Sequence, residues 1–398
     1  MFGQQVLDFL FPRRIIFGMD TISRVGSLAR ELSSGRSALI LTDRNLEGMG
    51  FMKEIRGHLE GEGFQAEVFS AIEAEPLEET VLGVAEHVRS LKPDIIIGVG
   101  GGSVLDMGKT ASVMATNPGD PLEYFGAPLM PAKRSPERRG TPKILIPTTA
   151  GTASEVTQFA VIIDRDRRTK KVLSSPYAMA DLALVDPSLT ASMPPRLTAG
   201  CGMDALSHAI EGYMSLWSSP LTDSISLEAS RLIFENLRMA YYNGGDMKAR
   251  YRMSLAASMA GIPLANARVV LGHSIAQVIG PRYGLPHGTA CAMALPYAMR
   301  YNLPVLIEKF CRLAWYMGIE LNGVKGRAAS VKVVEEVSNL SGELRITLSL
   351  NELGIPREDL PEIAEDIMKY QPRPNNPRTL VKEDLIELLE DMWNGKVI

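Results

Sequence analysis

Two hydrophobic patterns divide the chain. In the first half, short apolar runs rich in β-branched residues alternate with stretches in which apolar residues recur every three or four positions. The first pattern is typical of buried strands and the second of amphipathic helices. We expect strands at 14–18, 37–42, 64–70, 94–100, 143–147, 159–164 and 182–186, and helices between them at 24–33, 46–60, 77–91 and 103–115. This alternation predicts a parallel sheet covered on both faces, a Rossmann-like doubly wound α/β fold.

After Pro194 and Pro195 the helical pattern takes over and strand signals almost disappear. We expect helices at 197–216, 221–242, 247–262, 266–280, 288–301, 305–317, 326–350 and 381–393. The proline-rich segment 371–379 is expected to be a turn that leads into the last helix. Because 398 residues are long for one domain, we predict two. These are an α/β dinucleotide-binding domain over residues 1–190 and an all-α metal-binding domain over residues 191–398.

The composition is that of an ordinary folded protein and excludes several partners. A net charge of −4 provides no basic surface for nucleic acid. No apolar run approaches the roughly 18 residues that cross a bilayer, and the N-terminus lacks a signal-peptide pattern. The three cysteines show no CxxC spacing, which predicts free thiols in a reducing compartment. We therefore expect a cytoplasmic protein that binds neither nucleic acid nor membrane.

Three of the five histidines lie within one stretch, residues 203–288. Asp204 and His208 are four residues apart in a helical pattern, so both side chains lie on one face, one turn apart. His273 lies in a second helical pattern, and His287 begins a third. One carboxylate and three imidazoles suit a divalent metal such as Fe²⁺ or Zn²⁺. A lone histidine on an apolar helix is more often a core residue, but the four residues together predict a catalytic metal site.

A glycine-rich turn follows the apolar segment DIIIGVG and precedes a predicted helix. Such a turn lets backbone N–H groups approach a pyrophosphate at the helix N-terminus. Both the GxGxxG fingerprint and the Walker A loop fail here, because each requires a glycine where Ser103 stands. Lys109, in GKT at 108–110, nevertheless keeps a P-loop-type nucleotide hydrolase as an alternative. The candidate phosphate-binding residues are Gly100, Gly101, Gly102 and Ser103.

Two further features point to a nucleotide ligand. The threonines that follow the apolar segment KILIP offer hydroxyl groups to a phosphate, a ribose or a carboxamide; they are Thr148, Thr149 and Thr152. Asp43 ends the predicted strand at 37–42, where an acidic residue accepts from the adenosine ribose and repels a 2′-phosphate. A turn aspartate fits that position equally well. As a coenzyme residue, Asp43 favours NAD over NADP.

The motifs together resemble those of the iron-containing (group III) alcohol dehydrogenases, relatives of glycerol dehydrogenase and dehydroquinate synthase. They are FGMD at 17–20, GVGGGSVLDMGK at 98–109, IPTTAGTASEVT at 146–157, DALSHAIE at 204–211, GHSIAQVIG at 272–280, PHGTACAMALPYAMRYN at 286–302 and NNPRTLVKEDL at 375–385. The resemblance covers nearly the whole chain. It implies a catalytic cleft between the two domains and Fe²⁺, or Zn²⁺ in some members, on Asp204, His208, His273 and His287.

The resemblance also implies the coenzyme contacts and the reaction. The dinucleotide would lie over Gly101, Gly102 and Ser103, with the three threonines at the phosphates and nicotinamide, Lys170 at the ribose and Leu197 near the ring. The implied reaction is reversible hydride transfer between a small primary or secondary alcohol and NAD⁺, with the metal as Lewis acid, in a homodimer or larger homo-oligomer. The closest alternative is a metal- and NAD-dependent enzyme similar to dehydroquinate synthase (a lyase) or to glycerol dehydrogenase.

Several positions depart from the family pattern. Gln277 stands where a histidine is common near the nicotinamide. An amide cannot act as a base near neutral pH, so we expect the released proton to leave through water or ribose hydroxyls. Arg268 and Val270 replace small residues before the third ligand, and we expect them to narrow or charge the cleft. Glu75 stands where an asparagine near the coenzyme is frequent.

Overall fold

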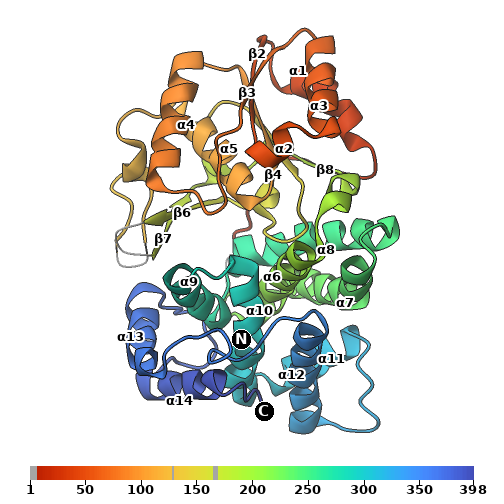
Figure 1. Cartoon of the computed structure of the whole chain (residues 1–398), viewed down its shortest axis with the longest axis vertical. Helices are drawn as coiled ribbons and strands as arrows, with labels where there is room; N and C mark the ends of the chain where they lie inside the picture. The colour runs from red at the N-terminus through yellow and green to blue at the C-terminus, as the bar shows by residue number, and fades with distance from the viewer. Residues whose placement is uncertain (1–6, 128–129, 165–168) are drawn as a thin grey trace.

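A six-stranded parallel sheet forms the first part of the molecule, and the helical second part lies against it (Figure 1). The computed structural model describes residues 7–127, 130–164 and 169–398. The strand order is β1-β8-β5-β4-β2-β3, and every neighbouring pair is parallel. The bounds are β1 Ile15–Phe17, β2 Ser37–Leu41, β3 Gln65–Phe69, β4 Ile95–Gly100, β5 Lys143–Pro147 and β8 Leu182–Val185.

Helices cover both faces of the sheet, as a doubly wound fold requires. In β2, Ala38 and Ile40 point to one side and pack with α1 (Val25–Leu32) and α3 (Gly50–Gly61). Leu39 and Leu41 point to the other side and pack with α4 (Glu78–Leu91) and α5 (Gly102–Met114). Because strand side chains alternate between faces, a strand buried on both sides is apolar throughout. The predicted α/β fold and its strands are therefore confirmed.

The predicted strand at 159–164 forms, but outside this sheet. It is β6 (Phe159–Asp164), and it pairs antiparallel with β7 (Thr169–Ser174), which the sequence did not predict. The segment TKKVLS carries two lysines and lacks an apolar run, so it gives no strand signal. Alternate residues of β6, Ala160 and Ile162, pack into the cluster around α4 and α5. The hairpin is thereby held at the edge of the cleft described below.

The second part of the chain is helical, as predicted. Its helices are α6 Pro195–Met214, α7 Pro220–Tyr242, α8 Met247–Asn266, α9 Leu271–Tyr283, α10 His287–Asn302, α11 Ile307–Tyr316, α12 Gly326–Glu343, α13 Leu360–Tyr370 and α14 Lys382–Trp393. Helix α6 is central: α7, α8 and α10 pack around it, and glycines allow this close packing. A side chain at Gly202 would collide with Leu237 of α7, and one at Gly212 with Pro263 of α8. The change from strands to helices falls between β8 and α6, and the division into domains at residue 190 stays a prediction.

Three helix predictions need correction, and one helix was missed. The helix expected at 46–60 is two helices, α2 (Arg44–Glu47) and α3. The helix expected at 266–280 begins only at Leu271, because residues 267–270 form a connection in which Arg268 has a left-handed backbone. The helix expected at 326–350 ends at Glu343, and α13 was not predicted.

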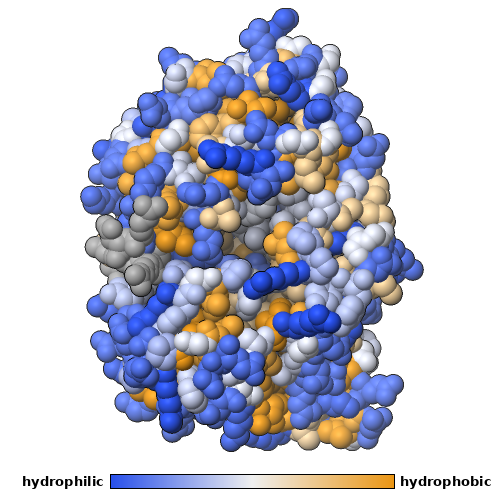
Figure 2. Space-filling model, in the orientation of Figure 1, coloured by the Kyte–Doolittle hydropathy of each residue, from blue (hydrophilic) through white to orange (hydrophobic). Residues whose placement is uncertain are grey.

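The outer surface is largely hydrophilic on the face shown in Figure 2. Within the described residues no single helix is both long and apolar enough to cross a membrane, and the one pair that meets the criteria jointly, α8 with α9, is bent by 102°.

Candidate metal and coenzyme site

A cleft with a volume of about 600 Å³ lies between the sheet part and the helical part. The sheet side contributes Gly102 and Ser103 at the start of α5, together with residues of the β6–β7 hairpin. The helical side contributes Asp204, His208 and residues of α9 and α10. The predicted glycine turn and the predicted metal ligands therefore face one cavity.

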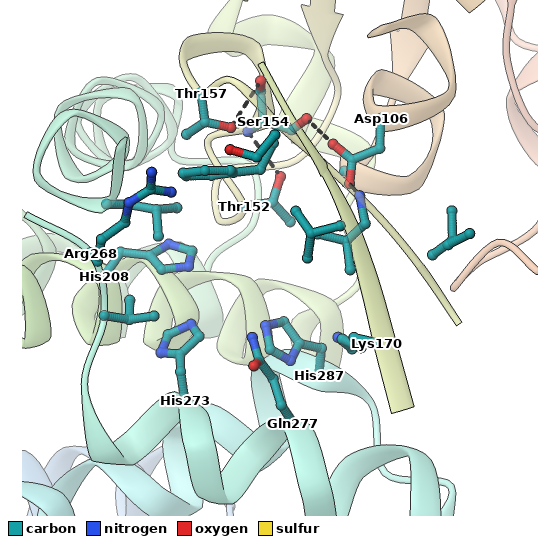
Figure 3. A pocket seen from close by; sticks show the side chains of 18 of the residues that line it. Asp106, Thr152, Ser154, Thr157, Lys170, His208, Arg268, His273, Gln277 and His287 are labelled. Atoms are coloured by element: carbon teal, nitrogen blue, oxygen red, sulfur yellow. Dashed lines mark hydrogen bonds between the residues drawn. The ribbon is translucent and has the colours of Figure 1, made fainter. Parts of the chain in front are cut away.

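The four predicted metal ligands all line this cleft, and Figure 3 shows the three histidines gathered there. Asp204 and His208 lie one turn apart on α6, His273 is in the first turn of α9, and His287 is the first residue of α10. The Nε2 atoms of His208, His273 and His287 lie 3.5, 3.7 and 3.8 Å from the same oxygen, Oδ1 of Asp204. These distances are too long for good hydrogen bonds, but they place four donor atoms around one point.

The chemistry of this cluster fits a divalent cation. Oδ1 of Asp204 is buried and has no hydrogen-bond partner among the described residues, which is costly for a carboxylate. Burial opposes ionisation, yet the charge of His208 and the other two imidazoles keeps the pKa of Asp204 far below its usual range. Burial lowers the pKa of His208 and, with the charge of Lys170, that of His287. At His273 burial is outweighed by the neighbouring Cys291 and Glu211, which raise the pKa well above its usual value, so a metal would displace a proton there. A carboxylate and neutral imidazoles are the forms that bind metals.

Glu211 supports the cluster, and the sequence reasoning missed it. It is fully buried on α6, two turns after Asp204. Its Oε1 accepts a hydrogen bond from Nδ1 of His273 at 2.6 Å, and its Oε2 accepts from the backbone N–H groups of Val270 at 2.8 Å and His273 at 3.2 Å. The bond to Nδ1 leaves Nε2 of His273 directed at Asp204, as in carboxylate–histidine–metal arrangements. The spacing i, i+4, i+7 in DALSHAIE was the available signal.

Cys291 is a second neighbour that the sequence reasoning did not place here. Its sulfur lies 3.6 Å from Nε2 of His273 and 3.6 Å from Nε2 of His287. The donor atoms of Asp204, His273, His287 and Cys291 all lie within 4.8 Å of one another, a grouping that omits His208. Burial raises the pKa of the Cys291 thiol to about 12, and the thiolate is the form that binds metals. We therefore favour His208 over Cys291 as the fourth ligand.

The glycine turn and the threonine loop meet at the carboxyl ends of β4 and β5, which are neighbours in the sheet. The backbone N–H of Thr148 donates to the carbonyl of Gly100 at 3.0 Å. A Cβ atom on Gly102 would lie 2.7 Å from the Thr152 side chain, so this approach requires glycine. Parallel sheets bind nucleotides at such carboxyl ends.

The predicted coenzyme residues divide into two groups. Gly102, Ser103, Thr152 and Lys170 line the cleft. The others do not line it; they are Asp43, Gly100, Gly101, Thr148, Thr149 and Leu197. Asp43 follows β2 and caps the short helix α2 (Arg44–Glu47), where its Oδ1 accepts from the N–H groups of Asn45 and Leu46 at 2.8 and 3.1 Å. Asp43 therefore has the structural role of a turn aspartate that the sequence also allowed, and its Oδ1 is used in that helix cap.

Lys109 is not available to a phosphate, which removes the P-loop alternative. Its side chain is fully buried, and Nζ donates to Oδ1 of Asp106 at 3.2 Å, to Oγ of Ser154 at 2.6 Å and to the carbonyl of Phe159 at 2.5 Å. In a Walker A loop the lysine must instead reach the β- and γ-phosphates. Here it ties α5 to the β6 strand.

The segment 371–379 does more than lead into the last helix. Gln371, Asn375 and Asn376 are buried, and Arg373 lines the cleft. Nη2 of Arg373 donates to Oε1 of Gln277 at 2.9 Å, so the amide that replaces the family histidine is held in place.

The chain is similar to known proteins over nearly its whole length. The family model described as iron-containing alcohol dehydrogenase matches residues 12–187, and the model for the C-terminal part of the Fe-containing alcohol dehydrogenase family matches residues 198–393. The 1,3-propanediol dehydrogenase of Citrobacter freundii is 35% identical over 391 residues, which cover 98% of this chain and 99% of that protein. The sulfoacetaldehyde reductase of Bilophila wadsworthia is 33% identical over 383 residues, which cover 95% of this chain and 97% of that protein.

A solved structure of a 1,3-propanediol oxidoreductase superposes on this chain with a TM-score of 0.92 at 34% identity and covers 98% of this chain and 100% of its own. The resemblance drawn from the motifs is thereby confirmed. The chain belongs to the iron-containing alcohol dehydrogenase family.

Proposed function

We propose that this protein is a metal-dependent, NAD(H)-linked alcohol dehydrogenase and aldehyde reductase that acts on a small primary or secondary alcohol by direct hydride transfer. The observation that carries the proposal is the convergence of Asp204 and three imidazoles on one point of the cleft that Gly102 and Ser103 also line. The relatives of the chain include alcohol dehydrogenases and a lactaldehyde reductase, which supports the proposal.

Asp204, His208, His273 and His287 are the proposed metal ligands. When bound, the metal supplies Lewis-acid polarisation of the substrate oxygen. Glu211 holds the His273 ring in one tautomer and orientation through its short bond to Nδ1. Cys291 is buried beside the cluster, and its raised pKa keeps the thiol neutral near neutral pH.

The proton released on alcohol oxidation needs a route that does not use residue 277. The side-chain oxygen of Gln277 accepts a hydrogen bond from Arg373, and an amide does not titrate near neutral pH. We infer that the proton leaves through water or ribose hydroxyls in the cleft.

The coenzyme contacts are proposed at the carboxyl ends of the strands. Gly102, Ser103, Thr152 and Lys170 line the cleft. The first three are proposed to contact the phosphates, and Lys170 is proposed to contact the ribose. The proposed set also includes residues outside the cleft lining. They are the backbone groups of Gly100 and Gly101, the hydroxyls of Thr148 and Thr149, the carboxylate of Asp43 and the side chain of Leu197. Asp43 supports NAD as the coenzyme rather than NADP, and the ligand set suits iron, with zinc as the alternative.

Three further properties belong to this proposal. The division into domains at residue 190 rests on the change from strands to helices. A cytoplasmic location is supported by three free cysteines. Assembly as a homodimer or larger homo-oligomer rests on the family resemblance.

The experiment is an anaerobic assay of iron-loaded protein with NADH and a set of small aldehydes, followed by the reverse reaction with the matching alcohols. We expect net NADH oxidation and net NADH formation, respectively. Asp204→Asn should lower turnover by more than about 100-fold, because loss of even an outer-shell partner costs metal sites roughly 10- to 100-fold. Asp391→Asn, on α14 and away from the cleft, is the control. A lyase that borrows NAD⁺ would show no net change in NADH, and that result would refute the proposal.

A further inference from the structure

Two arginine side chains line the cleft together with the proposed metal ligands, and they come from separate segments. Arg268 lies in the connection between α8 and α9, and Arg373 lies in the segment 371–379. Neither guanidinium forms an ion pair with a carboxylate within the described part of the chain. Positive charge in a partly buried cleft is costly unless something pairs with it.

Arg268 is held at a conformational cost. Its φ of 67° is left-handed, a region that a long side chain rarely adopts. Its backbone N–H donates to the carbonyl of Pro263 at 3.1 Å, which fixes the turn. The guanidinium lies 4.2 Å from the ring centroid of Phe159 and makes no side-chain hydrogen bond to any described residue. Burial, with the charge of Arg373, lowers the pKa of Arg268 to about 10, so it stays charged at neutral pH.

Arg373 is fixed by neutral partners. Nε donates to Oγ of Ser274 at 3.1 Å, and Nη2 donates to Oε1 of Gln277 at 2.9 Å and to Oε1 of Gln371 at 3.4 Å. Its Nη1 has no hydrogen-bond partner among the residues that the structure describes. Arg373 therefore presents a positioned guanidinium with donors to spare.

None of the three acidic residues of the lining forms an ion pair with Arg268 or Arg373 in the described part of the chain. Asp106 accepts from Lys109, Ser154 and the N–H of Val161. Asp204 belongs to the metal cluster. The remaining acidic residue of the lining, Glu75, lies on the coenzyme side, where its N–H donates to Oγ of Ser103. Glu211, which is buried outside the lining, acts on the charge of Arg373, but its oxygens accept from His273 and Val270 and it forms no ion pair with either arginine. A carboxylate or sulfonate on a bound ligand would therefore be the direct partner of the two guanidinium groups.

The arginines also lie where the substrate, rather than the coenzyme, would extend. In Figure 3, Arg268 and His208 are seen on one side of the cleft and Lys170 and His287 on the other, and the charge of Lys170 acts on His287. Arg373 contacts Gln277, which comes from the same helix as His273. The glycine turn is on the sheet side. A substrate whose oxygen is at the cluster can therefore direct its other end to the arginines.

We propose that Arg268 and Arg373 form a subsite for an oxyanion at the far end of the substrate, so that the enzyme reduces short aldehydes carrying a terminal carboxylate or sulfonate and oxidises the corresponding alcohols. Guanidinium groups bind both oxyanions through paired N–H donors. The proposal rests on the proposed function, and its reaction is the same. Hydride passes from NADH to the carbonyl carbon, a proton from water goes to the carbonyl oxygen, and NAD⁺ and the alcohol leave.

The test compares aldehydes of matched chain length in the iron-loaded enzyme. Succinic semialdehyde is paired with butyraldehyde, and sulfoacetaldehyde with propionaldehyde. We expect at least one anionic member to have a kcat/KM about tenfold or more above its neutral partner. Arg268→Gln and Arg373→Gln should each lower kcat/KM for that anionic aldehyde by about 10- to 100-fold. The kcat/KM for the neutral aldehyde should stay within about threefold of the wild-type value. Arg373→Lys, which keeps the charge, should retain part of the preference. Arg327→Gln, on the exposed surface of α12, is the control and should change neither.

Three results would overturn the subsite. Neutral and anionic aldehydes could be reduced equally well by the wild type. The two glutamine variants could lose both activities in parallel, which would mean a structural role. They could instead raise KM for NADH with either aldehyde, which would assign the arginines to the coenzyme phosphates. In each case the proposed dehydrogenase function survives.

A binding measurement covers the opposite case, in which no aldehyde is reduced and the proposed function fails. Calorimetry on metal-free protein at low ionic strength compares 4-hydroxybutyrate with 1-butanol. We expect 4-hydroxybutyrate to bind at least about tenfold more tightly and Arg268→Gln to remove the difference. Equal affinities would refute the subsite independently of turnover.

Discussion

Replacing Glu211 by glutamine removes one of its two acceptor oxygens. The substitution should weaken metal binding although it changes none of the proposed ligands. One Glu211 oxygen accepts from Nδ1 of His273 at 2.6 Å, and the other accepts from the N–H groups of Val270 and His273. In Glu211→Gln the side chain keeps its shape but offers only one acceptor oxygen, so one set of donors faces an NH₂ group. If the amide oxygen turns to the backbone, the His273 ring loses the bond that fixes its tautomer.

The size of the effect follows from those bonds. A buried hydrogen bond to a charged group contributes about 1.5–3 kcal/mol, and outer-shell changes at metal sites cost about 10- to 100-fold in affinity, which is about 1.4–2.7 kcal/mol. We therefore expect Glu211→Gln to raise the Kd for Fe²⁺ or Zn²⁺ by roughly 10- to 100-fold. The assay is chelator competition on folded protein, with circular dichroism to show that the fold is intact.

Glu155→Gln is the matched control. Glu155 is also a buried glutamate, but its Oε1 accepts from Oγ of Ser258 and has no bond to a proposed ligand. Glu155→Gln should leave the Kd for the metal within about threefold of the wild-type value. If Glu211→Gln folds and binds metal as tightly as the wild type, the positioning role assigned to Glu211 is wrong.

Four other predictions concern separate features. Gln277→His should introduce a new ionisation near pH 6–7 into the pH profile of kcat with little change in NAD⁺ affinity; identical profiles would argue against a proton relay through position 277. Asp43→Gly should raise kcat/KM for NADPH by about tenfold, and steady-state kinetics showing no gain would remove Asp43 from the coenzyme site. Cys291→Ser should leave one metal per chain by elemental analysis, whereas loss of the metal would make the sulfur a ligand. Burial lowers the pKa of Lys143 from 10.5 to about 8. Between these pH values the unfolded chain keeps a proton on Lys143 that the folded protein has lost. The free energy of unfolding should therefore rise with pH over this range, by up to roughly 3 kcal/mol. Denaturant titrations of Lys143→Met should show a smaller rise, and an equal rise would refute this assignment.

The sequence predicted the parts of the fold that local patterns determine. The β4 segment IIIGVG is apolar throughout, and in the structure it is buried on both faces, as its pattern indicated. The hairpin strand β7 carries lysines and gains its order by pairing with β6, so no local pattern revealed it. Helix α9 begins later than expected because the connection before it is shaped by hydrogen bonds to Glu211 and by the left-handed Arg268. Such long-range effects leave no mark on hydrophobic periodicity.

The candidate site shows the same division. The i, i+4 spacing of Asp204 and His208 can be read from the chain because one helix sets it. The approach of Cys291 to two histidines depends on how α9 and α10 pack, and that of Arg373 depends on where a proline-rich segment returns to the cleft. These residues come together only through tertiary packing, so the sequence could not show their proximity.

X-ray absorption spectroscopy of the zinc-loaded protein tests the proposed metal site most directly. Coordination by Asp204, His208, His273 and His287 predicts a first shell of nitrogen and oxygen at about 2.0–2.2 Å, with the outer scattering of three imidazole rings and no sulfur. A sulfur scatterer at about 2.3 Å, or fewer than three imidazoles, would contradict it.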